Sequence, residues 1–187
     1  MKLLLAVAGL GLLATVTVAQ EDDIWKFTIN NATNAKWTVN PDKLKPKKVP
    51  APEIPGELAL RVKATKGANP WDQQVNSPAG GAIKQGDVVM IIYYARAAEP
   101  AAEGTILPTY IQMSSAPYTA VIDAKFTVSD KWDQYCAHAV SSINLAKGNV
   151  SIHLAGADQV LEFGPVFVFN FGQNYDRSKL KGCQALG

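Results

Sequence analysis

Two stretches in which every second residue is apolar constrain the fold of this chain more than any other feature. One runs from Leu58 to Ala64 and the other from Val89 to Ala95. Strict alternation over this length is typical of a β-strand that buries one face in a core and presents the other to solvent. The segment between them holds the sequence Trp-Asp-Gln-Gln and a Gly-Asp turn. We therefore expect paired β-strands with one buried side.

The rest of the chain has the same character, and no long amphipathic helix is visible after residue 56. Val, Ile, Thr, Tyr and Phe recur in short runs separated by Gly, Pro, Asn, Ser and Asp, which predicts an all-β sandwich. Four prolines between residues 45 and 55 exclude a central strand there and predict an extended surface connection. The predicted strands are 25–30, 36–39, 58–65, 71–75, 88–97, 105–114, 119–128, 132–140, 149–154 and 160–171.

The first residues have the pattern of a cleaved signal peptide. One Lys precedes an uninterrupted apolar run, Thr17 and Ala19 supply the small residues that signal peptidase needs, and the chain then turns acidic. The run is too short to span a bilayer, although an uncleaved anchor is the alternative. We expect a signal peptide at 1–19, one β-sandwich domain at 20–174 and a tail at 175–187. The mature chain of 187 − 19 = 168 residues would have no transmembrane segment and would be secreted, into either the extracellular space or a periplasm.

The charge balance excludes partners that need a strong electrostatic field. The net charge is +2, and removal of Lys2 with the signal peptide leaves +1. A nucleic-acid or anionic-lipid partner is therefore not expected. One basic cluster, between Lys43 and Lys48, lies in the proline-broken segment. It is either a solvated loop or a site for an acidic polysaccharide such as a uronate-bearing glycan.

The two cysteines, Cys136 and Cys183, are an even number in a chain with an export signal, which favours a disulfide. Their separation of 47 residues would attach the polar tail to a strand. Without that bridge the tail is expected to be loosely held. The alternative is one buried thiol in a strand and one free thiol in the tail.

Residues that could catalyse a reaction are few. The chain has no G-x-S-x-G motif, and its two histidines, His138 and His153, fall in predicted strands, where an imidazole is more often packed or hydrogen-bonded. Cys136 and His138 would share one strand face but supply only two metal ligands. Most carboxylates stand beside turn residues, except Glu162, which lies in an apolar run with its orientation open. No catalytic residue is assigned, and the chain is not expected to be an enzyme.

A sugar-binding interpretation fits the residues better, because sugars need aromatic plates beside planar hydrogen-bonding groups. In the strand 88–97, the apolar alternation turns Tyr94 and Arg96 away from the core. In the strand 105–114, the same argument turns Tyr110 and Gln112 outward. These four side chains are predicted to share one binding face.

Two tryptophans are harder to place. Trp71 and Gln73 share one side of the strand 71–75, but burying Val75 on that side would bury Trp71 as well, so its orientation stays open. Trp132 opens a predicted strand, and core packing is favoured for it over ligand contact.

The order L-R-V, W, G-D-V and Y-Y-A-R-A between residues 58 and 97 resembles the jelly-roll carbohydrate-binding modules of the cellulose- and xylan-binding group, which accompany xylanases and other glycoside hydrolases. A weaker match continues through Trp132-Asp-Gln-Tyr135 and the strand 160–171, so the resemblance covers about two-thirds of the chain. It implies a galactose-binding-like β-sandwich. It also implies a polysaccharide cleft on the concave face of one sheet, where Tyr94, Arg96 and Gln112 would fall.

These modules often end on an I-D-D-V strand whose Asp helps to hold a structural calcium. Here the region reads Leu161-Glu162-Phe163, which puts the calcium in doubt, and no other cofactor is expected. The function that follows is secreted, non-catalytic binding of a plant- or microbe-type polysaccharide or oligosaccharide, with a separate glycoside hydrolase as a candidate partner. An exported structural or interaction protein is the alternative, and a small hydrolase with an unseen site is a third. The predicted carbohydrate-binding residues are Tyr94, Arg96, Gln112, Tyr110, Trp71 and Gln73.

Overall fold

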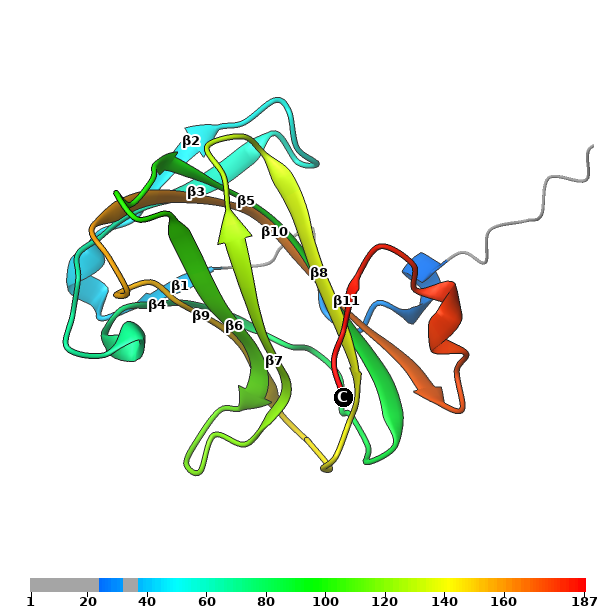
Figure 1. Ribbon diagram of the computed structural model, residues 1–187. Helices are drawn as coiled ribbons and strands as arrows, with labels where there is room; N and C mark the ends of the chain where they lie inside the picture. The colour runs from blue at the N-terminus through cyan, green and yellow to red at the C-terminus, as the bar shows by residue number, and fades with distance from the viewer. Residues whose placement is uncertain (1–23, 32–36) are drawn as a thin grey trace, which may run out of the picture.

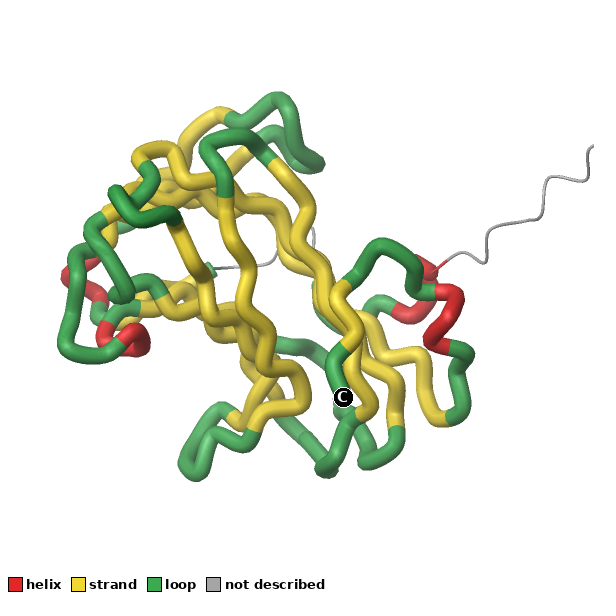
Figure 2. Tube along the Cα trace, viewed as in Figure 1, coloured by secondary structure: helices red, strands yellow, loops and turns green. Residues whose placement is uncertain are grey.

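The computed structural model describes residues 24–31 and 37–187, and most of their regular structure is β-strand (Figures 1 and 2). The helical elements of this part are the 3-10 helices η1 (Ile24–Phe27), η3 (Asp42–Leu44), η4 (Pro70–Asp72) and η5 (Arg177–Lys179). The predicted all-β class is therefore confirmed. The strands are β1 (Thr38–Asn40), β2 (Lys47–Pro50), β3 (Leu58–Ala64), β4 (Gln74–Pro78), β5 (Asp87–Glu99), β6 (Thr105–Met113), β7 (Ala120–Val128), β8 (Asp133–Val140), β9 (Gly148–His153), β10 (Gln159–Gln173) and β11 (Gln184–Ala185).

The strands form two sheets that pack as a sandwich (Figure 1). The five-stranded sheet has the order β1-β4-β9-β6-β7, and the six-stranded sheet has the order β11-β8-β5-β10-β3-β2. Neighbouring strands are antiparallel, except that the short β11 runs parallel to β8. From β3 to β10 the chain changes sheet at every connection except the β6–β7 hairpin. Such crossing between two antiparallel sheets gives the jelly-roll sandwich that the sequence predicted.

The core lies between the sheets and is built from the alternating positions that the sequence singled out. On β5, the odd-numbered residues from Val89 to Ala97 are fully buried in this core. On β6, Leu107 and Ile111 are buried against them. The Tyr93 hydroxyl lies 3.0 Å from the hydroxyl of Thr109, so the polar atoms enclosed in the core satisfy each other. Burial raises the pKa of Tyr93 above its usual range.

A second apolar cluster covers part of the outer side of the six-stranded sheet. Its buried members include Met90 of β5, Phe169 of β10 and Leu180 of the tail, and Phe27 of η1 packs against them. Phe27 also lies 4.9 Å from Phe171, ring centroid to ring centroid. Segments from both ends of the described chain therefore cover this part of the sheet.

The tail is attached to β8 in three ways. Cys136 and Cys183 form a disulfide with a Cα–Cα distance of 4.9 Å, so the predicted bridge is confirmed. Strand β11 adds main-chain pairing to β8. Arg177 donates from Nε to His138 Nδ1 at 3.2 Å and from Nη2 to the carbonyl of Leu186. The tail is therefore a packed part of the sandwich rather than a loose end.

Several predicted element boundaries were wrong. The predicted strand 25–30 is instead the helix η1, followed by a single bridge from Thr28 to Phe169. Trp71 lies in η4 rather than in a strand, and β4 begins at Gln74. The proline-rich connection contributes β2, which pairs with β3 at the edge of the sheet, the place where a strand tolerates proline.

The predicted signal peptide at 1–19 lies outside the described residues. Within 24–31 and 37–187, no helix is long and apolar enough to cross a membrane.

Candidate functional site

The outer face of the five-stranded sheet, which points away from the core, is rich in amide and aromatic side chains. The strand registers place Asn76 of β4, Ser151 of β9 and Tyr110 of β6 side by side in one row. The neighbouring row contains Gln74 and His153. Opposed residues in antiparallel strands project from the same face of a sheet, so the rows form one surface. We call this set, together with the adjoining tryptophan, the polar face; its members are Trp71, Gln74, Asn76, Tyr110, Gln112, Asn149, Ser151 and His153.

Hydrogen bonds between side chains fix the amides of the polar face. Asn149 donates from Nδ2 to Oδ1 of Asn76 at 2.9 Å, and Ser151 donates from Oγ to Oε1 of Gln74 at 2.9 Å. Gln74 in turn donates from Nε2 to the carbonyl of Trp71 at 2.8 Å. Asn76 Nδ2 and Asn149 Oδ1 make no hydrogen bond with the described residues, which leaves an NH₂ group and an amide oxygen for a ligand.

Three rings form a row across the polar face. The centroid of the His153 ring lies 4.7 Å from that of Tyr110 and 6.3 Å from that of Trp71. The Trp71 side chain remains 54% exposed. An exposed indole beside a tyrosine offers apolar ring surface to a ligand, while the neighbouring amides offer hydrogen bonds.

The turn that carries Trp71 has defined geometry. Pro70 begins η4, and the main-chain N–H of Asn69 donates to Oδ2 of Asp72 at 2.9 Å. A Cβ atom at Gly67 would lie 2.8 Å from that same carboxylate oxygen, so a larger residue there would displace the Asp72 side chain. The indole is therefore presented by a braced turn rather than by a flexible loop.

Burial keeps the titratable groups of the polar face uncharged near neutral pH. The pKa of His153 is lowered because burial disfavours the imidazolium, although the carboxylate of Asp123 partly opposes this effect. The pKa of Tyr110 is raised by burial and, to a smaller extent, by Asp123. A neutral imidazole and a neutral phenol therefore lie side by side at pH 7.

The outer face of the six-stranded sheet has a different chemistry, centred on Glu162. This side chain is completely buried, which resolves the orientation that the sequence left open. Its Oε1 accepts from Nε of Arg61 at 2.6 Å, and its Oε2 accepts from Nε of Arg96 at 2.7 Å. The Arg96 guanidinium also lies 5.1 Å above the ring of Trp132. Both carboxylate oxygens are thus bound to arginine, which leaves Glu162 unsuited to hold the calcium of the related modules.

The ring of Tyr94 is not exposed as a flat surface for a ligand. It is half-buried in a small apolar cluster with Ile54, and its hydroxyl donates to Oε1 of Gln134 at 3.1 Å. A Cβ atom at Gly164 would lie 2.4 Å from Ile54 Cδ1 and 3.0 Å from Tyr94 Cβ, so these side chains pack directly over the glycine.

The predicted single binding face was wrong. Tyr94 and Arg96 project from β5 on the outer face of the six-stranded sheet. Tyr110 and Gln112 project from β6 on the outer face of the five-stranded sheet. The whole core separates the two pairs, because alternation shows that a residue leaves the core but not on which side of the sandwich.

Gln73 and Trp71, which the sequence placed on one side of a strand, point to different places. Gln73 is buried, accepts from the main-chain N–H of Thr65 at 3.0 Å and donates to the Thr65 hydroxyl at 2.8 Å. It therefore joins η4 to the end of β3 and is not available to a ligand. Trp71 turns outward because the helix breaks the strand periodicity before β4 begins.

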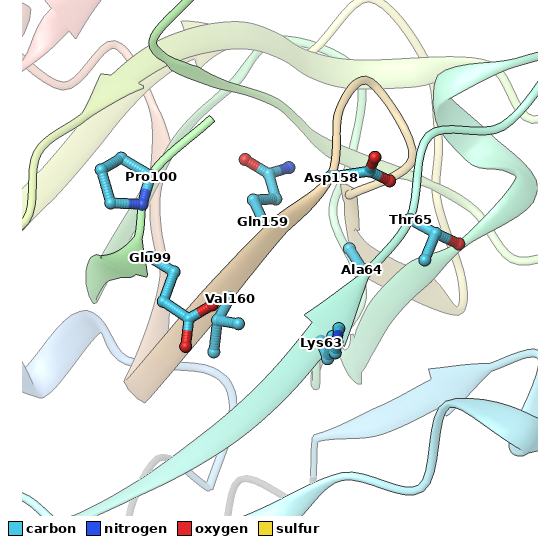
Figure 3. Close-up of a pocket in the computed structure, with 8 residues that line it drawn as sticks. All are labelled: Lys63, Ala64, Thr65, Glu99, Pro100, Asp158, Gln159 and Val160. Atoms are coloured by element: carbon cyan, nitrogen blue, oxygen red, sulfur yellow. The ribbon is translucent and has the colours of Figure 1, made fainter. Parts of the chain in front are cut away.

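A pocket of about 440 Å³ lies where β3, β5 and β10 meet at their ends (Figure 3). It contains one cation, Lys63, and two carboxylates, Glu99 and Asp158. Asp158 accepts a hydrogen bond from the main-chain N–H of Lys66 at 2.8 Å, so it serves the turn between strands. No group of three or more His, Cys, Asp or Glu side chains suited to a metal ion occurs in residues 24–31 and 37–187.

The Cys136-Ala-His138 sequence has a structural explanation. The Cys136 sulfur belongs to the disulfide, so it is neither a thiolate nor a metal ligand. Burial and the nearby Arg177 guanidinium lower the pKa of His138, whose Nδ1 accepts the hydrogen bond from that arginine.

Sequence reasoning missed most of the polar face. Val150, Ile152 and Leu154 alternate as a buried set, so their neighbours Ser151 and His153 must face outward. From this alternation the outward direction of Ser151 and His153 could have been predicted. The position of β9 between β4 and β6 could not, because the three strands are far apart in the sequence.

Comparison with known proteins finds likeness in structure only. No protein-family model and no curated protein matches the sequence. The second N-terminal cellulose-binding domain of β-1,4-glucanase C from Cellulomonas fimi superposes with a TM-score of 0.55 at 15% identity, over 79% of this chain and 93% of that one. A xylan-binding domain from Paenibacillus barcinonensis gives a TM-score of 0.50 at 16% identity, over 77% of this chain and 91% of that one.

A xylanase from Clostridium thermocellum, which joins a carbohydrate-binding module to a catalytic module and was solved with xylohexaose, gives a TM-score of 0.56 at 10% identity. The match covers 80% of this chain and 30% of that one. This chain therefore has the jelly-roll β-sandwich fold of the carbohydrate-binding modules of the cellulose- and xylan-binding group, as its sequence resemblance implied.

Proposed function

We propose that the chain is a non-catalytic carbohydrate-binding protein and that the polar face is its binding site. One observation carries this proposal: an exposed indole, a tyrosine and a row of fixed amides lie together on one rigid sheet. Apolar C–H faces of a sugar ring would stack on Trp71 and Tyr110. Its hydroxyls would bond to Asn76 Nδ2, Asn149 Oδ1 and the Gln112 amide.

The charge of this surface favours a neutral glycan. The formal charges beside the polar face include Asp72 next to Trp71, Lys147 just before β9, and Asp123 and Lys125 on β7, which are two of each sign. A uronate or sulfate group would meet no excess of positive charge here. Neutral β-linked chains such as cellulose and xylan, which domains of this fold bind, are therefore the first ligands to test.

The disulfide supports a place of action in an oxidising compartment. The disulfide between Cys136 and Cys183 is typical of exported proteins and agrees with the signal peptide expected at 1–19. Outside the cell the protein would attach itself, or a separate glycoside hydrolase, to a polysaccharide.

Replacement of Trp71 by Ala tests the site. If a sugar ring covers about 60 Å² of indole at about 25 cal/mol/Å², the loss is about 1.5 kcal/mol, or roughly tenfold in Kd. Trp25→Ala is the matched control, because Trp25 is 52% exposed and packs on Phe167 of the other sheet. Titration calorimetry with cello-, xylo- and mixed-linkage oligosaccharides should show the loss for Trp71→Ala and not for Trp25→Ala.

Two results would contradict the proposal. If the wild-type protein binds no member of the panel and is not retained on insoluble cellulose or xylan, the sandwich is an interaction protein without sugar binding. If the wild type binds and the Trp71→Ala and Tyr110→Ala variants bind equally well, the sugar contacts another surface.

A further inference from the structure

Cationic side chains form a row on the outer face of the six-stranded sheet. Lys47 of β2 is paired with Arg61 of β3, Arg61 with Glu162 of β10, and Glu162 with Arg96 of β5. Lys63 lies two residues along β3 from Arg61 and therefore on the same face. We call Lys47, Arg61, Lys63 and Arg96 the basic strip. With neighbouring strands about 4.8 Å apart, it extends about 14 Å across four strands.

The strip has an excess of positive charge. Four cations against the one carboxylate of Glu162 give 4 − 1 = +3, and counting Glu99 and Asp158 beside Lys63 reduces the excess to 4 − 3 = +1. Lys47 and Lys63 are exposed and form no ion pair with the described residues. Glu99 and Asp158 approach the strip at Lys63, from the pocket at the strand ends (Figure 3).

Hydrogen bonds to Glu162 hold the side chains of Arg61 and Arg96 in place. Arg96 uses only Nε for Glu162 and lies over Trp132, so its Nη1 and Nη2 make no hydrogen bond with the described residues. Arg61 uses Nε and Nη2 for Glu162, which leaves its Nη1. The side chain of Arg61 is 45% exposed and that of Arg96 is 28% exposed, so a ligand can reach both. A guanidinium held in one plane with unused donors is suited to bind a carboxylate.

The spacing of these cations favours a polymer of moderate charge density. Duplex nucleic acid carries one charge per about 1.7 Å and is held by many simultaneous phosphate contacts, which four cations spread over a sheet do not supply. A polyuronate has one carboxylate on each sugar and therefore a lower charge density than duplex nucleic acid. We infer that the basic strip binds the carboxylates of a uronate-bearing polysaccharide. It does so on the side of the sandwich opposite the polar face and independently of it.

The basic cluster noted in the sequence now has a place. Lys47, one of its members, is brought by the edge strand β2 beside Arg61, which lies fourteen positions further along the chain. The cluster is therefore part of a surface that three other strands complete, rather than only a solvated loop.

The test compares polygalacturonate with its methyl ester, which has the same backbone without the charges. Titration calorimetry at about 0.02 M salt should show binding of the acid and not of the ester. Because exposed ion pairs are screened, the binding should weaken strongly at about 0.3 M salt. The double variant Lys47→Gln/Lys63→Gln should bind the acid about tenfold more weakly, since two exposed ion pairs with the carboxylates are lost.

The control is Lys147→Gln/Lys181→Gln, which makes the same change of charge at two exposed lysines outside the strip. It should stay within about twofold of wild type, as expected if only contacts in the strip matter. Because the lysines of both variants are unpaired in the described residues, equal thermal midpoints should show that the fold is intact.

The same variants separate this inference from the proposed function. Trp71→Ala should keep full binding of polygalacturonate, while Lys47→Gln/Lys63→Gln should keep any binding of neutral oligosaccharides. Equal binding of acid and ester, or equal loss in the two lysine variants, would overturn the inference. Tighter binding of duplex DNA or of anionic lipid vesicles than of polygalacturonate at the same salt would also overturn it.

Discussion

Glu162 is the residue whose charge should matter most to the stability of this sandwich. Its side chain is completely buried, and both oxygens accept hydrogen bonds from arginines on neighbouring strands. Replacement by Gln keeps the shape and removes the charge. It also presents an NH₂ group to one of the arginines, because a Gln amide has only one oxygen.

The size of the effect follows from the contacts. In the Glu162→Gln variant, the amide oxygen could still accept from Arg61, but the 2.7 Å hydrogen bond from Arg96 would be lost, and both arginines would lose their counter-ion. A hydrogen bond to a charged group contributes about 1.5–3 kcal/mol, and the partial exposure of both arginines lets water compensate in part. We expect Glu162→Gln to lower the free energy of unfolding by about 2–3 kcal/mol, and the melting temperature by about 5–10 °C.

Urea unfolding followed by tryptophan fluorescence measures this change. Glu103→Gln, at an exposed glutamate in the turn between β5 and β6, should stay within about 0.5 kcal/mol of wild type. Arg96→Met should cost about as much as Glu162→Gln, and the two together should cost clearly less than their sum, because they break the same interaction. If Glu162→Gln is as mild as Glu103→Gln, the ion network does not stabilise the fold.

Two further changes test the tail and the polar face. Replacing both Cys136 and Cys183 by Ala should lower the free energy of unfolding by about 4 kcal/mol, from the loop-entropy relation for a separation of 47 residues; a loss below about 1 kcal/mol in urea unfolding would refute this. The folded-state pKa of His153 is lowered, so the unfolded chain binds the proton more readily below about pH 6.5. Stability should therefore fall as the pH decreases from 7 to 5, and His153→Gln should flatten that dependence in thermal melts; an unchanged slope would contradict it.

Local pattern was sufficient to predict the fold class. The alternation of apolar residues identified the buried residues of β5 and β6 correctly. A strand with one face in the core and the other toward solvent has an apolar residue at every second position. The predicted strand at 25–30 was wrong for a related reason. Its apolar residues, including Trp25 and Phe27, are explained by packing of a 3-10 helix on Phe167 and Phe171.

The proposed binding face could not be predicted in the same way. The alternation along each strand shows that Arg96 and Tyr110 both point away from the core. The side of the sandwich on which each lies depends on the order of strands in the two sheets. That order is set by pairings such as β6 with β9, between residues about 40 positions apart, which leave no local trace. Trp71 was among the predicted binding residues, but its orientation stayed open, because a short 3-10 helix interrupts the strand periodicity just before β4.

The outer faces of the two sheets are covered to different extents. On the six-stranded sheet, η1 and the disulfide-linked tail cover Met90 and Phe169, while Ile54 covers Tyr94. The exposed surface there includes the basic strip and Trp25. On the five-stranded sheet, Trp71 stays exposed beside His153 and Tyr110. Exposure alone does not single out Trp71, because Trp25 is 52% exposed; the proposed site depends on the fixed amides beside Trp71. Detaching the tail should therefore disturb the six-stranded sheet and leave sugar binding on the polar face intact.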